Sequence, residues 1–145
     1  MHDASRSPIV LLLSKVVSPY IMLFGMYVIF HGHYSPGGGF QGGAMMAASI
    51  LLIRIAYNEQ VHQLQFKRAL GLPLAALGVL IYIGVGLTPL LLGGRFLDYG
   101  LLPLYGIEAS HIRSFGILGI EIGVGLAVMA VLVAIYDNLL EGNRD

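Results

Sequence analysis

The sequence predicts an all-α membrane protein with four transmembrane helices, and three observations support this. Apolar residues make up 57% of the 145 residues and charged residues only 11%, against about half and a quarter in soluble domains. The few charges leave four apolar runs, each about as long as the ~20 residues that cross a ~30 Å hydrocarbon core as a helix. Alternating strand patterns are absent, and backbone groups in lipid must be paired internally. We therefore expect one domain over 1–145, with helices at about 8–30, 40–57, 69–92 and 112–136.

Each predicted span carries very few formal charges. The first contains only Lys15, the second only Arg54 and the third none, while the fourth holds Arg113 near its start and Glu121. The first run is too long for the core of a signal peptide, and no small-residue cleavage site follows it, so we expect it in the mature protein.

The distribution of Lys and Arg outside the spans predicts the orientation. Four spans place both termini on the same side as the connector 58–68. That side carries four basic residues, Arg6, Lys67, Arg68 and Arg144, whereas the other side has Arg95 and Arg113. The positive-inside rule then puts both termini in the cytoplasm of a prokaryotic cell and the glycine-rich connector outside.

Composition also excludes several functions. Net charge is zero and no basic cluster is longer than Lys67-Arg68, so nothing indicates a nucleic-acid partner. The chain has no cysteine, which removes disulfides, thiolate metal sites and thiol nucleophiles.

Residues 37–42 match the G-x-G-x-x-G pattern of dinucleotide-binding folds. That pattern binds a nucleotide only between a strand and a helix, with an acidic residue about 20 positions further on. Here it follows a membrane helix, Glu59 falls on the opposite side, and the loop has no lysine. We instead expect the glycines to serve the backbone, either by offering the N–H groups of Gly37 to Phe40 to an anion or by close packing on a neighbour.

The segment His31-Gly-His-Tyr-Ser-Pro-Gly-Gly-Gly-Phe-Gln-Gly-Gly43 resembles the signature loop of the MnhB component of Mrp-type (Mnh or Sha) multisubunit cation/proton antiporters. That loop reads Gly-His, two variable residues, then Pro-Gly-Gly-Gly-Phe and small residues. The matching positions here are Gly32, His33, Pro36, Gly37, Gly38, Gly39, Phe40, Gly42 and Gly43. The resemblance extends to four spans, a charged connector after the second, and Glu121 within Gly-Ile-Glu-Ile-Gly-Val-Gly in the fourth.

The resemblance implies a structural and coupling subunit of a complex that exchanges Na+ for H+ across the plasma membrane. Expected partners are the large antiporter-like A and D chains and the small C, E, F and G chains. It implies no enzyme chemistry, cofactor or metal in this chain, and the length is too short for an antiporter module with broken helices. Two alternatives stay open: the equivalent subunit of a membrane-bound respiratory hydrogenase complex, and a self-assembling small channel or scaffold.

Small residues in two spans predict close helix packing. Gly43 and Ala47 are four apart in the second span, and Gly119, Gly123 and Ala127 repeat at the same interval in the fourth. Such rows let helix backbones approach each other in lipid. Spacing does not distinguish contacts within the chain from contacts with partner subunits.

Glu121 is the main candidate for an ion or proton pathway. It lies about nine residues into its predicted span, or ~13 Å deep, where a carboxylate must be protonated, paired or hydrated. It either lines such a pathway or makes a fixed hydrogen bond or ion pair. Lys15 is its expected partner at a gap of ~7–10 Å in level, although Lys15 can instead snorkel to the cytoplasmic headgroups.

Three further residues belong to the pathway candidates. Arg54 is three residues from the end of its span and is expected mainly to snorkel. His31 and His33 stand at the outer end of the first span. They can relay protons, hydrogen-bond the loop, or bind a metal with His111 and Asp98. The aromatic connector 93–111 is expected either on the outer membrane surface or against a partner.

Overall fold

A computed structural model describes residues 7–32, 34, 36–57, 67–104 and 106–142. Over these ranges it contains four long helices and no strand: α1 (Pro8–Phe30), α2 (Gly39–Ala56), α4 (Gly71–Leu91) and α5 (Ala109–Gly142). Two short 3-10 helices, η2 (Arg68–Leu70) and η3 (Tyr99–Leu101), lie in the connectors. All four long helices are long and apolar enough to cross a membrane. The all-α class with four spans is confirmed.

The helix bounds agree with the sequence except in α5. The first span is 8–30 as expected, and α2 and α4 differ by one or two residues at each end. In contrast, α5 has 34 residues where 112–136 was expected. At 1.5 Å per residue it is about 51 Å long, well beyond a hydrocarbon core of ~30 Å.

Local sequence explains where the helices begin and end. Pro8 opens α1, a position that needs no backbone N–H. At the start of α2, the Gln41 side chain accepts a hydrogen bond of 3.2 Å from the Gly38 N–H. Gly93 ends α4 in the left-handed region with φ +86°, which favours glycine because it lacks a Cβ.

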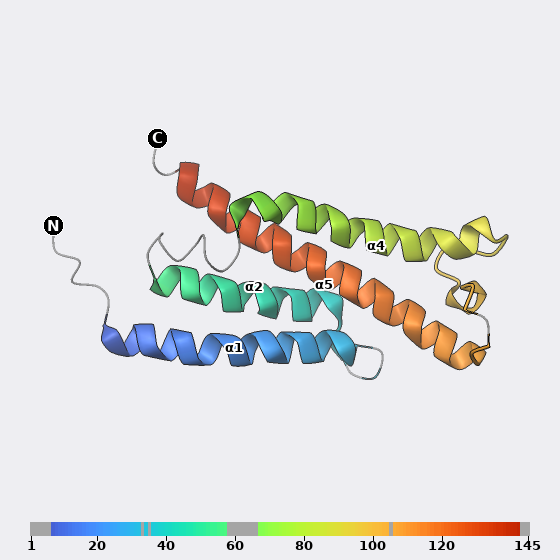
Figure 1. Cartoon of the computed structure of the whole chain (residues 1–145), viewed down its shortest axis with the longest axis horizontal. Coiled ribbons are helices and arrows are strands. Elements are labelled where there is room, and N and C mark those ends of the chain that lie inside the picture. The colour runs from blue at the N-terminus through green and yellow to red at the C-terminus, as the bar shows by residue number, and fades with distance from the viewer. Residues whose placement is uncertain (1–6, 33, 35, 58–66, 105, 143–145) are drawn as a thin grey trace.

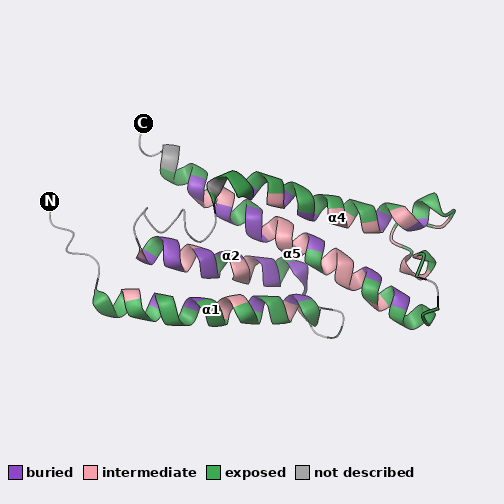
Figure 2. Cartoon of the chain, in the orientation of Figure 1, coloured by how far each residue is buried: buried purple, intermediate pink, exposed green. Residues whose placement is uncertain are grey.

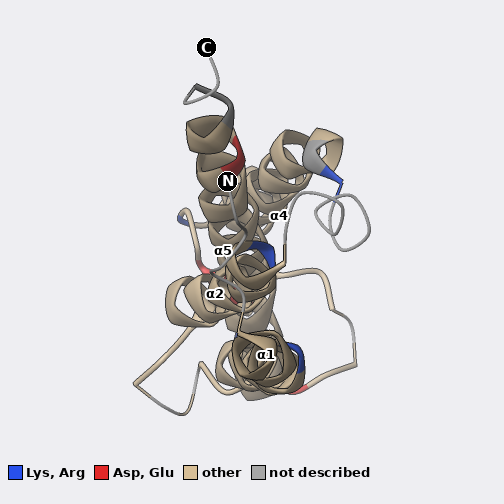
Figure 3. Ribbon diagram, turned by 90° about the vertical axis from the view of Figure 1, so that its left-hand side faces the viewer, with Lys and Arg blue, Asp and Glu red and all other residues tan. Residues whose placement is uncertain are grey.

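The four helices lie in an open row in the order α1, α2, α5, α4 (Figure 1). Figure 3 views the row nearly end-on, with α1 at one edge and α4 at the other. The start of α1 and the end of α5 lie at one end of the row, and the α1–α2 and α4–α5 connectors lie at the opposite end (Figure 1). This agrees with an even number of spans, while the cytoplasmic placement of the termini stays a prediction.

The core lies between α2 and α5. It consists of Ala47, Ile50, Met129 and Val133, each less than 9% exposed. Figure 2 shows buried residues concentrated on α2 and exposed residues along the outer sides of α1 and α4. Both faces of α2 are therefore covered by this chain, whereas the edge helices present apolar side chains outward.

Glycines bring the neighbouring helices together. Gly42 of α2 faces Gly25 of α1, where an added Cβ would come 2.6 Å from the Gly25 carbonyl oxygen. Gly43 faces Gly125 of α5, with the Gly125 Cα 2.9 Å from such a Cβ. On the far side of α5, Gly78 of α4 lies against Gly123 and Ala127. These close contacts are all within the chain.

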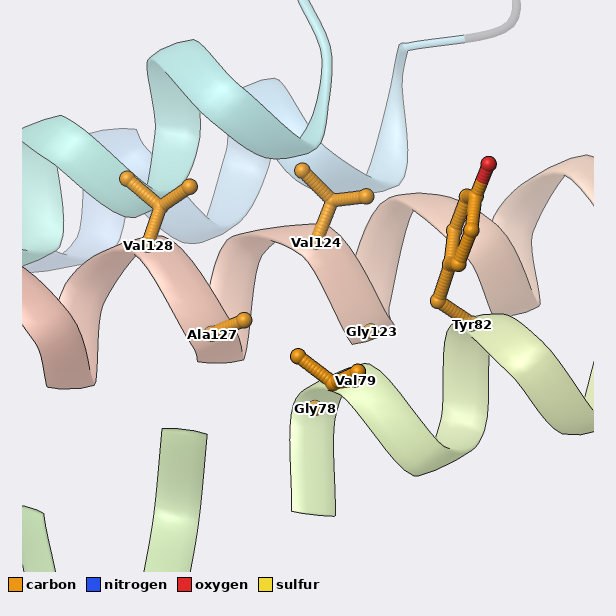
Figure 4. Close-up of a pocket in the computed structure, with 7 residues that line it drawn as sticks. All are labelled: Gly78, Val79, Tyr82, Gly123, Val124, Ala127 and Val128. Carbon is orange, nitrogen blue, oxygen red and sulfur yellow. The ribbon is translucent and has the colours of Figure 1, made fainter. Parts of the chain in front are cut away.

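Gly119 and Ala47 occupy less crowded or more central sites. A Cβ on Gly119 would be 3.3 Å from Val85 of α4, and Ala47 is 1% exposed in the α2–α5 core. A shallow apolar groove of about 240 Å³ runs between α4 and α5 (Figure 4). Its lining includes Gly78, Tyr82 and Gly123.

Candidate functional site

The turn between α1 and α2, residues 31–39, surrounds the carboxyl group of Glu121. A Cβ on Gly32 would lie 3.0 Å from the Glu121 Cδ, and a Cβ on Gly38 would lie 2.7 Å from Oε1. A Cβ on Gly39 would overlap the backbone oxygen of Glu121. Three glycines of the signature loop therefore leave the space that this carboxyl group occupies.

The Glu121 carboxylate also closes the start of α2. The Gly39 N–H donates a hydrogen bond to Glu121 Oε2. Gly39 is the first residue of α2, where unpaired N–H groups and the positive end of the helix dipole favour an anion. The glycine turn thus does bind an anion, and the anion is a side chain of the same protein rather than a nucleotide phosphate.

Tyr99 of η3 is the nearest titratable group on the connector side. Burial raises its pKa, and the charges of Tyr82 and Glu121 raise it further. Its ring packs against Gly116 of α5, where an added Cβ would come 2.6 Å from Tyr99 Cδ1. Tyr99 therefore stays a neutral phenol, able to donate a proton in a hydrogen bond, close to the Glu121 side of α5.

A second polar contact joins α2 and α5 at their other ends. Arg54 Nη1 donates to Asp137 Oδ1, and the two side chains are 1% and 7% exposed. The expectation that Arg54 snorkels is therefore wrong: its guanidinium lies inside the chain because an acidic partner stands at the same level. Asp137 was missed, since it falls one residue beyond the predicted end of the fourth span.

Lys15 and Glu121 are not brought together. The Glu121 carboxyl lies beside Gly32, just past the end of α1. Lys15 is exposed and precedes Phe30 by 15 residues, or about 22 Å along the helix axis. The expected gap of 7–10 Å is wrong, because α5 begins several turns beyond α1 and α2 and its residue 121 is level with their outer ends.

The histidines are placed only in part. His31 is exposed, stacks on Tyr27 with 4.0 Å between ring centroids, and has Nδ1 3.1 Å from the Tyr27 carbonyl oxygen. His33 lies outside the described residues. Among the described residues no group of three or more metal-ligating side chains occurs, and His111 and Asp98 are exposed.

The other signature residues lie around the turn. A Cβ on Gly37 would be 3.0 Å from Val28 Cγ1 of α1, so the turn packs against that helix. Pro36 is exposed, and Phe40 is 64% exposed on the outside of α2. Phe40 therefore contributes nothing to the internal packing of the turn.

The connector between α4 and α5 folds back on its own helices. The Leu97 N–H donates to the Gly86 carbonyl at 3.2 Å, and Gly94 N–H donates to Pro89 at 3.0 Å. Leu97 adopts a φ of +64°, an uncommon conformation for a bulky residue. This return path holds η3, with Tyr99, against α5.

Comparison with known proteins identifies the family. The family model described as "Domain related to MnhB subunit of Na+/H+ antiporter" matches residues 9–134. The chain belongs to this family. With its four spans, this MnhB-family chain is a multi-pass protein of the prokaryotic plasma membrane.

Relatives cover most of the chain. It is 31% identical to the MnhB-type Na(+)/H(+) antiporter component of Alkalihalophilus pseudofirmus over 88% of this chain and 91% of that protein. It is 34% identical to an uncharacterized protein of Methanocaldococcus jannaschii over 87% of this chain, but spans only 49% of that protein.

A solved structure shares the fold. A chain of the membrane-bound sulfane sulfur reductase, an archaeal respiratory membrane complex, matches with a TM-score of 0.71 and 30% identity. The match covers 97% of this chain and 60% of that chain. The MnhB-type fold therefore also occurs as part of a longer chain in a respiratory complex.

Proposed function

We propose that this MnhB-family chain is a structural and coupling subunit of a hetero-oligomeric Na+/H+ antiporter complex. The observation that carries the proposal is the match to the MnhB-type antiporter component over 91% of that protein. Its partners are the large antiporter-like A and D chains and the small C, E, F and G chains, with both termini in the cytoplasm.

The internal polar contacts suit a structural role. Glu121 is held by the Gly39 N–H, and Arg54 by Asp137. The two contacts lie at opposite ends of α2, and the apolar core with Ala47 and Ile50 lies between them. Ions or protons that cross the membrane must then use other chains or a path that this chain shares with a partner.

We also propose that Glu121 contributes to such a shared path. The carboxyl is partly exposed rather than sealed in the core, and it lies at one end of the spans, where water and partner subunits have access. Glu121→Gln tests this role, since the amide oxygen still accepts the Gly39 hydrogen bond but the group no longer titrates. Glu108→Gln is the matched control on the exposed connector.

The measurement is Na+-dependent proton exchange in everted vesicles that contain the whole complex. A pathway role predicts loss of exchange in Glu121→Gln with unchanged assembly, and normal exchange in Glu108→Gln. Undiminished exchange in both variants would restrict Glu121 to capping α2.

A second candidate follows from the similarity to the sulfane sulfur reductase complex. There the same fold would couple redox chemistry, not exchange alone, to ion movement. Copurification separates the candidates: the tagged chain is extracted gently from its native membrane, and stoichiometric partners are identified by mass spectrometry. Multi-span antiporter chains alone support the exchanger, and iron-sulfur or nickel-iron subunits support the respiratory complex. A lone homo-oligomer would overturn both.

A further inference from the structure

The outward face of α1 carries a row of aromatic side chains. Tyr20, Phe24, Tyr27 and His31 are spaced by four, three and four residues, which places them on one face of a helix. Tyr20, Phe24 and Tyr27 are 69%, 54% and 54% exposed. The Phe24 and Tyr27 rings stack at 6.2 Å, and Tyr27 stacks on His31 at 4.0 Å. We refer to these four residues as the aromatic row.

Tyr20 lies near the middle of the span. It follows Pro8 by 12 residues and precedes Phe30 by 10, or about 18 Å and about 15 Å along the axis. A tyrosine side chain is too short to carry its hydroxyl to either surface of a ~30 Å hydrocarbon core. Its hydroxyl therefore lies where no water is available.

The Tyr20 hydroxyl makes no hydrogen bond to any residue that the structure describes. Other hydroxyls on or facing α1 are paired: Tyr57 donates to the Leu11 carbonyl at 3.0 Å, and Ser18 donates to the Ser49 carbonyl at 2.9 Å. Acyl chains offer no acceptor, and polar groups in the hydrocarbon region are normally paired. Lipid alone is thus a poor cover for this face.

The position of α1 supports cover by another helix. It is an edge helix of the open row (Figure 3), and only 17% of its apolar window is buried, against 50% for α2. A helix laid on the aromatic row would continue the row of helices and bury aromatic rings that stack well on a neighbour.

We infer that the aromatic row is the docking surface for a transmembrane helix of a neighbouring subunit, which presents a hydrogen-bond acceptor at the level of Tyr20. The acceptor is a polar side chain or a backbone carbonyl freed at a helix break, the two kinds available inside a bilayer. This inference rests on the proposed function, because it requires a partner subunit.

Photo-crosslinking in the whole complex tests the surface. The photoreactive residue p-benzoyl-phenylalanine replaces Phe24 in one variant and Phe30 in the other. Phe24 and Phe30 are the same residue type on the same helix, 54% and 47% exposed, but six residues apart and so ~120° around the axis. We expect Phe24 to yield an adduct with one other subunit at least fivefold more efficiently than Phe30.

Removal of single hydroxyls tests the hydrogen bond. Tyr20→Phe keeps the ring and loses the donor, so we expect roughly three- to tenfold weaker retention of the crosslinked subunit during detergent washing. Tyr27→Phe is the control, since Tyr27 lies three residues from the end of α1, where water can replace a partner. Its retention should match that of the unaltered chain.

The outcomes separate the inference from the proposed function. Capture of lipid alone at position 24, equal adducts at 24 and 30, or adducts between two copies of this chain would each overturn the docking surface, and the proposed function would stand if other subunits still copurified. If no other subunit copurified, both would fail. Equal retention of Tyr20→Phe and Tyr27→Phe would remove the acceptor.

Discussion

Removing either member of the Arg54–Asp137 ion pair is expected to weaken the packing of α2 on α5. The side chains are 1% and 7% exposed, so Arg54→Met leaves the Asp137 carboxylate buried without this cation. Breaking one side of a buried pair costs about 3–5 kcal/mol, whereas exposed pairs contribute only about 0–1 kcal/mol. Arg54→Met and Asp137→Leu should therefore each lower the free energy of unfolding by roughly 3 kcal/mol or more.

The double replacement distinguishes an ion pair from simple packing. Apolar residues of similar volume can substitute for a buried pair with little loss. Arg54→Met with Asp137→Leu should accordingly be less harmful than the sum of the single changes, with a coupling of about 1–3 kcal/mol. Unfolding is followed by circular dichroism of the purified protein as sodium dodecyl sulfate is added to dodecyl maltoside micelles.

Lys15→Met is the matched control, because it removes a positive charge from an exposed site on α1. It should change the unfolding free energy by less than about 0.5 kcal/mol. The reasoning would be refuted by single variants as mild as this control, or by a double variant whose loss equals the sum of its parts.

The glycine turn and the α1–α2 contact give two further predictions. Gly38→Ala should lower the melting temperature and the monodisperse yield, since its Cβ would lie 2.7 Å from Glu121 Oε1; Gly84→Ala, whose Cβ meets nothing within 4 Å, should leave both unchanged or improved, and equal behaviour would contradict the cradle. Ser49→Ala removes two hydrogen bonds to Ser18, of 2.7 Å to its carbonyl and 2.9 Å between the hydroxyls, and should cost about 1–2 kcal/mol in the same detergent titration. A loss below 0.3 kcal/mol, on the order of measurement error, would mean that these bonds contribute no net stability.

The four spans were predictable because the length of an apolar run is set by the bilayer and little else. The bounds of α5 were not, since a helix continues past the lipid wherever its residues can remain hydrogen-bonded and solvated. Ala109 lies three residues before the predicted start of the span, and Asp137 one residue after its predicted end. That small difference concealed the partner of Arg54. A cation inside a predicted span is a signal to search the ends of the other spans for an acid.

The two parts of the glycine site were visible in the sequence, but their contact was not. The N–H groups at the start of α2 predict an anion, and Glu121 predicts a need for a donor. Joining them requires the order of the helices and the offset between α2 and α5. Neither is encoded in residue spacing, and counting from the predicted start of the fourth span placed Glu121 too deep.

Both polar contacts of α2 reach far along the chain, over 82 residues from Gly39 to Glu121 and 83 from Arg54 to Asp137. During synthesis α2 is made well before α5, so it enters the membrane while neither acid exists. A ribosome that stalls after α4 would leave Arg54 in the bilayer without its carboxylate and the start of α2 without its cap. Membrane quality control can recognise such a fragment by its unmatched charge. The last helix to be made therefore decides whether the second one is retained.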